Sequence, residues 1–129
     1  MAGGFRVSAV GIPRLQAGED VKPFAVLLTA AAARDLEELY RYIALHDAPG
    51  KAEHVLTSIE KAFGSLSENP NRGAHPKELL ALGIRDYREI FFKPYRVIYR
   101  VLGNVVHIFL IADGRRDMQT LLQRRLLDA

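Results

Sequence analysis

The stretch from Ile84 to Asp117 constrains the fold more than any other, because two turn signals divide it into three strand-like runs. Gly103-Asn104 lies between apolar residues, and such a pair is typical of a two-residue β-hairpin loop. Lys93-Pro94 marks the other turn. Residues 105–112 are nearly all apolar and rich in β-branched and aromatic types, as in a central strand covered over most of its area. The stretch therefore predicts a three-stranded antiparallel meander.

The turns also predict which residues face one another and which side of the sheet is buried, because side chains alternate along a strand. With two-residue loops, the predicted pairs are Leu102 with Val105, Arg100 with His107, Ile98 with Phe109, Arg96 with Ile111, Phe92 with Tyr95, Phe91 with Arg96, Glu89 with Ile98 and Tyr87 with Arg100. The apolar side, expected to form the core, carries Ile90, Phe92, Val97, Tyr99, Val101, Val106, Ile108 and Leu110. The other side carries Tyr87, Glu89, Arg96, Arg100 and His107 and is expected to be partly open.

The residues before and after the meander predict an α+β domain. A short strand at 24–29 precedes two amphipathic helices with apolar residues at helical spacing, the first ending near His46 and the second at Asn69-Pro70. These helices form an antiparallel hairpin that covers the apolar side of the meander. Asp117 is placed to cap a short C-terminal helix. Residues 23–129 are expected to form this single domain. Residues 1–22 are expected to be a flexible N-terminal extension, because their glycines and Pro13 break any period.

Composition excludes several classes of function. The 129 residues include no cysteine, the four histidines have no metal-ligand spacing, and no phosphate-binding glycine loop occurs, so neither a metal nor another cofactor is expected. No apolar run approaches the roughly 20 residues of a membrane span, and a cytoplasmic location without membrane contact is expected. Residues 85–129 carry nine Arg or Lys against five Asp or Glu, a surplus of 9 − 5 = 4. A basic second half favours an acidic partner.

Arginines on the predicted open side are the candidate functional residues. Arg96 and Arg100 share that side with His107, and Arg115-Arg116 follows the last strand of the meander. Arginines fixed on strands can bind a phosphate through two parallel hydrogen bonds, or pair with the carboxylates of a protein partner. The residues fit equally well a structural role in which Arg96 or Arg116 forms an ion pair with Glu89 or Asp117.

Three motifs resemble the RelE/ParE superfamily, the toxins of type II toxin–antitoxin modules. They are Asp-Tyr-Arg-Glu at 86–89, Tyr-Arg-Val-Ile-Tyr-Arg at 95–100 and Ile-Ala-Asp-Gly-Arg-Arg-Asp at 111–117, and the resemblance covers about residues 24–127. It implies a growth-arresting, plasmid-stabilising toxin with a cognate antitoxin protein as its partner. It also implies one of two activities: RelE-like members cut mRNA on the ribosome, and ParE-like members poison DNA gyrase.

The resemblance assigns candidate catalytic residues one by one. Arg96 and Arg116 match the two arginine positions of the RelE-like nucleases, and Arg88 matches a lysine position. Two residues depart from the pattern. Ile90 falls near a second lysine position of the family, and Leu122 falls near the position of the family's C-terminal tyrosine. Unless Tyr87 or His107 substitutes, a general base is missing. The departures favour a non-catalytic, ParE-like toxin that binds DNA gyrase, with a ribosome-dependent endoribonuclease as the alternative and a non-toxic antitoxin-binding module as the third reading.

Overall fold

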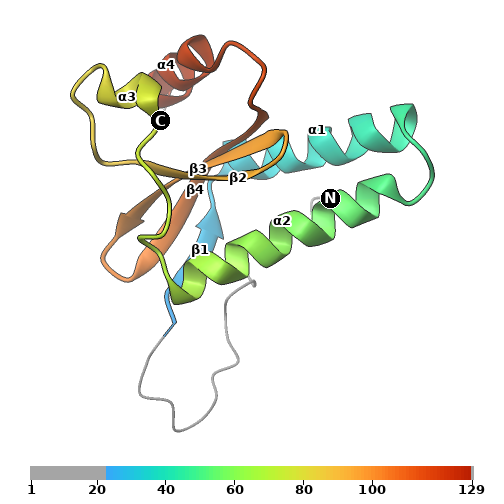
Figure 1. The fold of residues 1–129 in the computed structure, drawn as a ribbon, viewed down its shortest axis with the longest axis horizontal. Helices are drawn as coiled ribbons and strands as arrows, with labels where there is room; N and C mark the ends of the chain where they lie inside the picture. Colours follow the sequence, from blue (N-terminus) through green and yellow to red (C-terminus); the bar gives the residue numbers. More distant parts are fainter. Residues whose placement is uncertain (1–22, 129) are drawn as a thin grey trace, which may run out of the picture.

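The computed structural model describes residues 23–128, and the predicted extension at residues 1–22 lies outside them. Figure 1 shows a twisted sheet with a long helix hairpin on one face and two short helices on the other. The elements are β1 Ala25–Leu28, α1 Ala30–His46, α2 Lys51–Glu68, α3 Lys77–Leu80, β2 Arg88–Phe92, β3 Tyr95–Leu102, β4 Val105–Asp113 and α4 Met118–Asp128. The predicted α+β fold is confirmed. Among the described residues, no helix combines the length and apolar content that crossing a membrane requires.

The helix hairpin begins and ends where local sequence signals dictate. Thr29 caps α1, since its Oγ1 accepts a hydrogen bond from the amide of Ala32 at 3.1 Å. The helix ends at His46. α2 begins after Gly50, whose φ of 87° lies in the left-handed region that glycine adopts at little cost. Both helices turn their apolar residues toward the sheet, and the packing of this apolar face supplies most of their stability.

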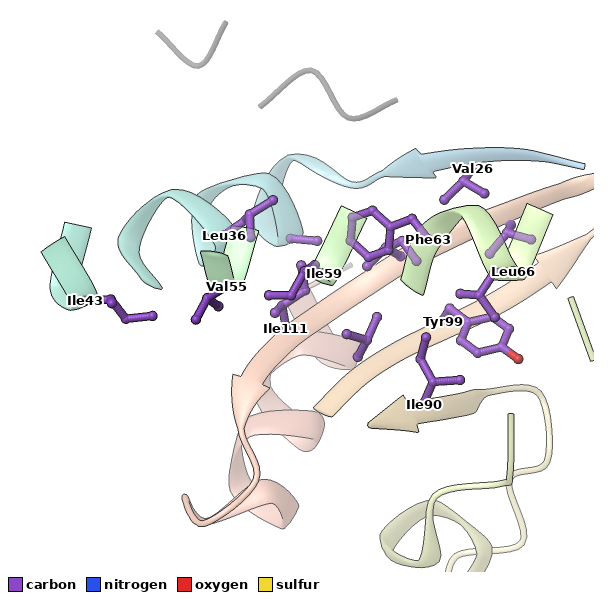
Figure 2. Packing of buried hydrophobic residues seen from close by; sticks show 14 of the residues in the cluster. Val26, Leu36, Ile43, Val55, Ile59, Phe63, Leu66, Ile90, Tyr99 and Ile111 are labelled. Atoms are coloured by element: carbon purple, nitrogen blue, oxygen red, sulfur yellow. The ribbon is translucent and has the colours of Figure 1, made fainter. Parts of the chain in front are cut away.

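The sheet has the strand order β1-β4-β3-β2, with β1 parallel to β4 and the other pairs antiparallel. The helix hairpin is thus the crossover that returns the chain from β1 to the sheet. It buries a main core against the sheet, in which Phe63, Ile59 and Leu36 meet Val26, Tyr99 and Ile90 (Figure 2). Burial of each large apolar side chain contributes roughly 1.5–3 kcal/mol of transfer free energy, so this layer accounts for most of the fold's stabilisation.

The predicted register is correct over most of the meander and wrong at one end of β4. Arg100 lies opposite His107 and Phe91 opposite Arg96, as expected. Between Ile98 and Tyr99 the register shifts, because β4 contains one extra residue, Phe109. Ile98 therefore pairs with Leu110, and Arg96 pairs with Ala112. Such a β-bulge reverses the faces of all later residues on its strand.

The bulge exchanges two residues between the faces of the sheet. Ile111 enters the main core, whereas Leu110, which the alternation assigned to that core, belongs to a second cluster on the opposite face. The second cluster consists of Leu79, Tyr87, Ile98, Leu110, Ala112, Met118 and Leu122. It lies beneath α3 and α4. The connection between α2 and β2, for which the sequence predicted no helix, therefore contains α3, which closes part of the predicted open face.

A buried tyrosine hydroxyl ties the loop after α2 to the sheet. Tyr99 Oη donates a hydrogen bond to the carbonyl of Pro70 at 2.6 Å and accepts one from the amide of Gly73 at 3.0 Å. A Cβ at Gly73 would lie 2.6 Å from both Tyr99 Oη and the carbonyl oxygen of Glu89. No side chain fits there without displacing backbone, so glycine is required by space at this position.

We predict that Gly73→Ala destabilises the protein by about 1–3 kcal/mol, because the methyl group overpacks a site bounded by backbone. Gly64→Ala in α2 is the matched control. A Cβ there meets no heavy atom within 4 Å, so the change is expected to stabilise the helix by about 0.5–1 kcal/mol. Urea unfolding followed by circular dichroism measures both. Equal effects of the two changes would contradict the close approach at Gly73.

Candidate functional site

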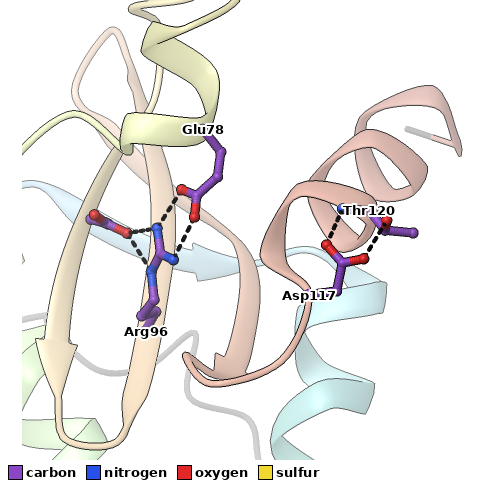
Figure 3. A network of polar contacts seen from close by, with 5 residues as sticks. Glu78, Arg96, Asp117 and Thr120 are labelled. Carbon is purple, nitrogen blue, oxygen red and sulfur yellow. Dashed lines mark hydrogen bonds and ion pairs between the residues drawn. The ribbon is translucent and has the colours of Figure 1, made fainter.

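Arg96 lies at the centre of a buried ion-pair network (Figure 3). Its Nη1 and Nη2 atoms donate to the two carboxylate oxygens of Glu78 at 2.9 and 2.8 Å, and its Nε donates to Glu89 Oε1 at 2.7 Å. Arg96 is 6% exposed. Glu89 comes from the neighbouring strand and Glu78 from α3. The network therefore fastens α3 to the sheet.

The two carboxylates of this network respond to their surroundings in opposite directions. The hydrogen bonds from Arg96 hold the pKa of Glu78 below its ordinary value. Burial raises the pKa of Glu89 above its ordinary value, and this exceeds the opposing effect of Arg96. The hydrogen bonds to Glu78 raise the pKa of Arg96 further, so its guanidinium stays charged. The network carries two carboxylates for one cation, and Glu89 is the member that gains a proton first on acidification.

The expectation that Arg96 lies on an accessible basic face is wrong. Arg96 is on the predicted side of β3, opposite the main core, but α3 covers it and two carboxylates occupy its guanidinium. The alternative of a structural ion pair with Glu89 describes its geometry. Sequence reasoning missed Glu78, because nothing in a short loop-like segment marks a residue that pairs with a strand 18 residues later.

The other arginines at the end of β4 have different surroundings. Arg115 is exposed and its Nε donates to Asp113 Oδ1 at 2.9 Å. Arg116 is exposed and has no ion-pair partner within residues 23–128. Asp117 does not pair with it but caps α4, accepting hydrogen bonds from Thr120 N at 3.1 Å and Thr120 Oγ1 at 2.8 Å (Figure 3). The predicted cap is thus confirmed.

One part of the outer sheet face is open, as predicted. It carries Leu27 of β1, His107 of β4, and Arg100 and Leu102 of β3, and we call these residues the open face. Leu27 and Leu102 are 38% and 45% exposed. The Arg100 guanidinium lies 5.6 Å from the ring centre of Tyr87 and 3.5 Å from Asp86, a weak exposed pair. The open face is mainly apolar with one accessible cation.

The structure does not gather the predicted catalytic residues at one point. His107 and Arg100 are cross-strand neighbours, but six residues of strand separate His107 from Asp113, or about 20 Å at 3.3 Å per residue, and Arg116 lies beyond. Arg88 Nη1 is bound to the carbonyl of Gly73 at 2.7 Å. No group of three His, Asp or Glu side chains that could hold a metal occurs in the described part of the chain.

Tyr87 and the two positions that depart from the nuclease pattern are all buried. The Tyr87 ring packs edge-on against Phe109 in the second cluster, with ring centres 5.3 Å apart. Ile90 is 5% exposed in the main core, and Leu122 is 2% exposed in the second cluster. The Ile90 and Leu122 side chains serve packing, and the Tyr87 ring is part of the second cluster.

A second surface feature, which sequence reasoning missed, is a groove of about 790 Å³ between the start of α1 and α4. We call it the α1–α4 groove; its lining includes Ala30, Ala31, Arg34, Phe109, Leu121 and Arg124. An ion pair is also part of its lining. Arg125 donates to both oxygens of Asp35 at 2.9 Å and to the carbonyl of Phe109 at 2.6 Å. Asp35 and Arg125 are 90 residues apart, and no local pattern connects them.

Comparisons with known proteins agree on one family. A family model for the ParE toxin of the type II toxin–antitoxin system parDE matches residues 26–118. Toxin ParE3 of Caulobacter vibrioides is 30% identical over 100 residues, which cover 78% of this chain and 96% of ParE3. The family-model match lies within the described residues 23–128.

Two solved structures have a similar fold. A chain of the chromosomal ParDE system from P. aeruginosa has a TM-score of 0.58 at 23% identity, over 70% of this chain and 95% of that chain. A chain of the toxin–antitoxin complex RelBE2 from Mycobacterium tuberculosis has a TM-score of 0.51 at 26% identity, over 71% of this chain and 99% of that chain.

We predict that Arg96→Met destabilises the protein by about 3–5 kcal/mol, because it leaves two buried carboxylates without their cation. Arg116→Met removes an exposed arginine and is expected to change stability by about 0.5 kcal/mol or less. Chemical unfolding at pH 7 compares the two. If Arg96→Met lowers the free energy of unfolding by no more than Arg116→Met does, a structural role for the network is contradicted.

We also predict a pH-dependent effect of Glu89→Gln. The pKa of Glu89 is higher in the folded state than in the unfolded state. Its contribution to the free energy of unfolding is therefore fully present below the ordinary pKa of 4.5 and is lost as the pH rises through the folded-state pKa. Glutamine does not titrate, so the variant gains stability relative to the wild type as the pH rises through that window. Glu78→Gln is the control of opposite sign. The lowered pKa of Glu78 makes its contribution present above 4.5 and lost on acidification.

Unfolding free energies of both variants at several pH values from about 3 to 7 test this pair of predictions, because the Glu78 window lies below the ordinary pKa of 4.5 and the Glu89 window lies above it. The two difference curves should have slopes of opposite sign. Parallel curves would show that burial does not dominate at Glu89.

Proposed function

Because the chain belongs to the ParE toxin family of type II toxin–antitoxin systems, we propose that it arrests growth by binding DNA gyrase without catalysing a reaction. We further propose that a cognate antitoxin neutralises it by covering its binding surfaces, and that both act in the cytoplasm, where gyrase works. The family membership confirms the superfamily that the three strand motifs predicted.

The observation that carries the proposal is the burial of Ile90 and Leu122. A lysine that binds phosphate, or a tyrosine that moves a proton, must reach the substrate. At these two positions the chain instead has aliphatic side chains inside the two cores. Proton transfer by a positioned group contributes roughly 10²–10⁴ in rate, so its absence argues against an efficient ribonuclease.

The arginines give further support. A guanidinium stabilises a phosphate by directing its N–H groups at the phosphate oxygens. Arg96 directs three of these donors at Glu78 and Glu89, and Arg88 directs one at the backbone of Gly73. Releasing Arg96 would leave two carboxylates buried without a partner, which is costly. Of the matched arginines, only Arg116 is exposed without an ion pair among the described residues.

A binding function agrees better with the open face. Exposed leucines beside an accessible arginine and a histidine resemble the composition of protein interfaces, where apolar contacts supply affinity and arginine is enriched. We propose that Leu27, Leu102 and Arg100 contact gyrase.

We predict that the purified chain inhibits supercoiling by gyrase at micromolar concentration and that Leu102→Asp weakens this inhibition about tenfold or more, since it places a charge in an apolar contact. Leu45→Asp is the control, because Leu45 is an even more exposed leucine, on α1 and away from the open face. Circular dichroism checks that both variants are folded. Inhibition that is equally weakened by both changes would contradict a role for the open face.

Mapping of mRNA 5′ ends after induction tests the ribonuclease alternative. New 5′ ends that disappear in Arg116→Ala, with gyrase unaffected, would replace the proposed function by RelE-like cleavage. Arg96→Ala is unsuitable here, because its effect on folding would imitate a loss of catalysis. Harmless overexpression of the folded chain would favour the non-toxic antitoxin-binding module.

A further inference from the structure

The α1–α4 groove combines an apolar base with unpaired positive charge. Its base is formed by Ala30, Ala31, Phe109 and Leu121, all at least partly accessible. Arg34 and Arg124 line it as exposed side chains, and neither has an ion-pair partner within residues 23–128. This combination of cations over apolar surface is suited to an amphipathic acidic segment.

The start of α1 adds to the positive potential of the groove. The side chain of Thr29 accepts a hydrogen bond from the amide of Ala32, and the first turn of the helix contains no acidic residue. The aligned peptide dipoles of a 17-residue helix leave about half a positive charge at its N-terminus. This end of the helix lies in the groove beside Arg34 and Arg124, so three sources of positive potential act on the same space.

The negative groups in the groove do not cancel these charges. Asp35 is fully engaged, because its carboxylate accepts both hydrogen bonds from Arg125 and a third from the amide of Ile111 at 3.0 Å. That pair is neutral as a unit. Glu38 is the other carboxylate of the lining, against the two cations Arg34 and Arg124, and the balance is one positive charge before the helix end is counted.

We propose that the α1–α4 groove docks an acidic amphipathic segment of the cognate antitoxin. Carboxylates of that segment pair with Arg34 and Arg124, and its apolar side chains contact Phe109 and Leu121. The inference rests on the proposed function, in that it assumes an antitoxin partner. An apolar base supports a protein segment over a nucleic acid, whose phosphates would gain little from Leu121 and would meet the carboxylate of Glu38.

The test measures the affinity of each toxin variant for the purified cognate antitoxin, by calorimetry at two salt concentrations. Arg34→Glu and Arg124→Glu are each expected to weaken binding about 10–100-fold, and the effect should shrink at high salt because the contacts are charged. Lys61→Glu makes the same change of charge at an exposed position of α2 outside the groove lining, and it should change affinity less than about threefold.

A second variant tests the apolar base independently of charge. Ala31→Trp places a large side chain in the groove from a partly exposed helical position, and it should weaken antitoxin binding at least tenfold while the circular dichroism spectrum is retained. Unchanged affinity of Arg34→Glu, Arg124→Glu and Ala31→Trp would overturn the docking site and leave the toxin assignment intact. Failure of the wild-type chain to bind the antitoxin at all would instead contradict the proposed function.

Discussion

The β-bulge at Phe109 is the constraint on which the rest of the structure depends. β1 ends opposite Ile108, so the following part of β4 has no strand on that side. Its backbone groups pair instead with side chains, the amide of Ile111 with Asp35 and the carbonyl of Phe109 with Arg125. Because buried backbone groups left unpaired are costly, this ion pair allows β4 to continue past its neighbour. It also joins α1, β4 and α4 at one point.

The bulge divides the sheet into two working halves. Before it, β4 presents His107 to an outer face that the described elements leave open. After it, Leu110 and Ala112 turn to that same face and pack beneath α3 and α4. One extra residue thus produces a covered half with a second core and an open half with exposed leucines and Arg100. The proposed gyrase contact and the α1–α4 groove lie on the two sides of this boundary.

Arg96 shows why a charged residue on a strand does not by itself indicate function. The alternation of β3 correctly assigned it to the face opposite the main core. On an open sheet that position would give a free guanidinium for a phosphate. Here α3 brings Glu78 across it, and burial with two carboxylates makes the same residue part of the framework. Leu122, which falls near the position where the resemblance places a tyrosine, is likewise part of the second cluster.

By itself, the sequence determined the elements other than α3, the α+β class, most of the strand register and the family. Turn pairs, helix caps and apolar periodicity are local signals, and the strand motifs are contiguous. Only the tertiary structure decided that Arg96 is buried, that Leu110 and Ile111 exchange faces, and that Asp35 meets Arg125. Two of these depend on contacts between residues far apart in the chain. The exchange of faces depends on a single-residue bulge, which cannot be recognised in a strand whose residues are nearly all apolar. Local preferences specify an element, but the packing of elements specifies which of its polar side chains reach solvent.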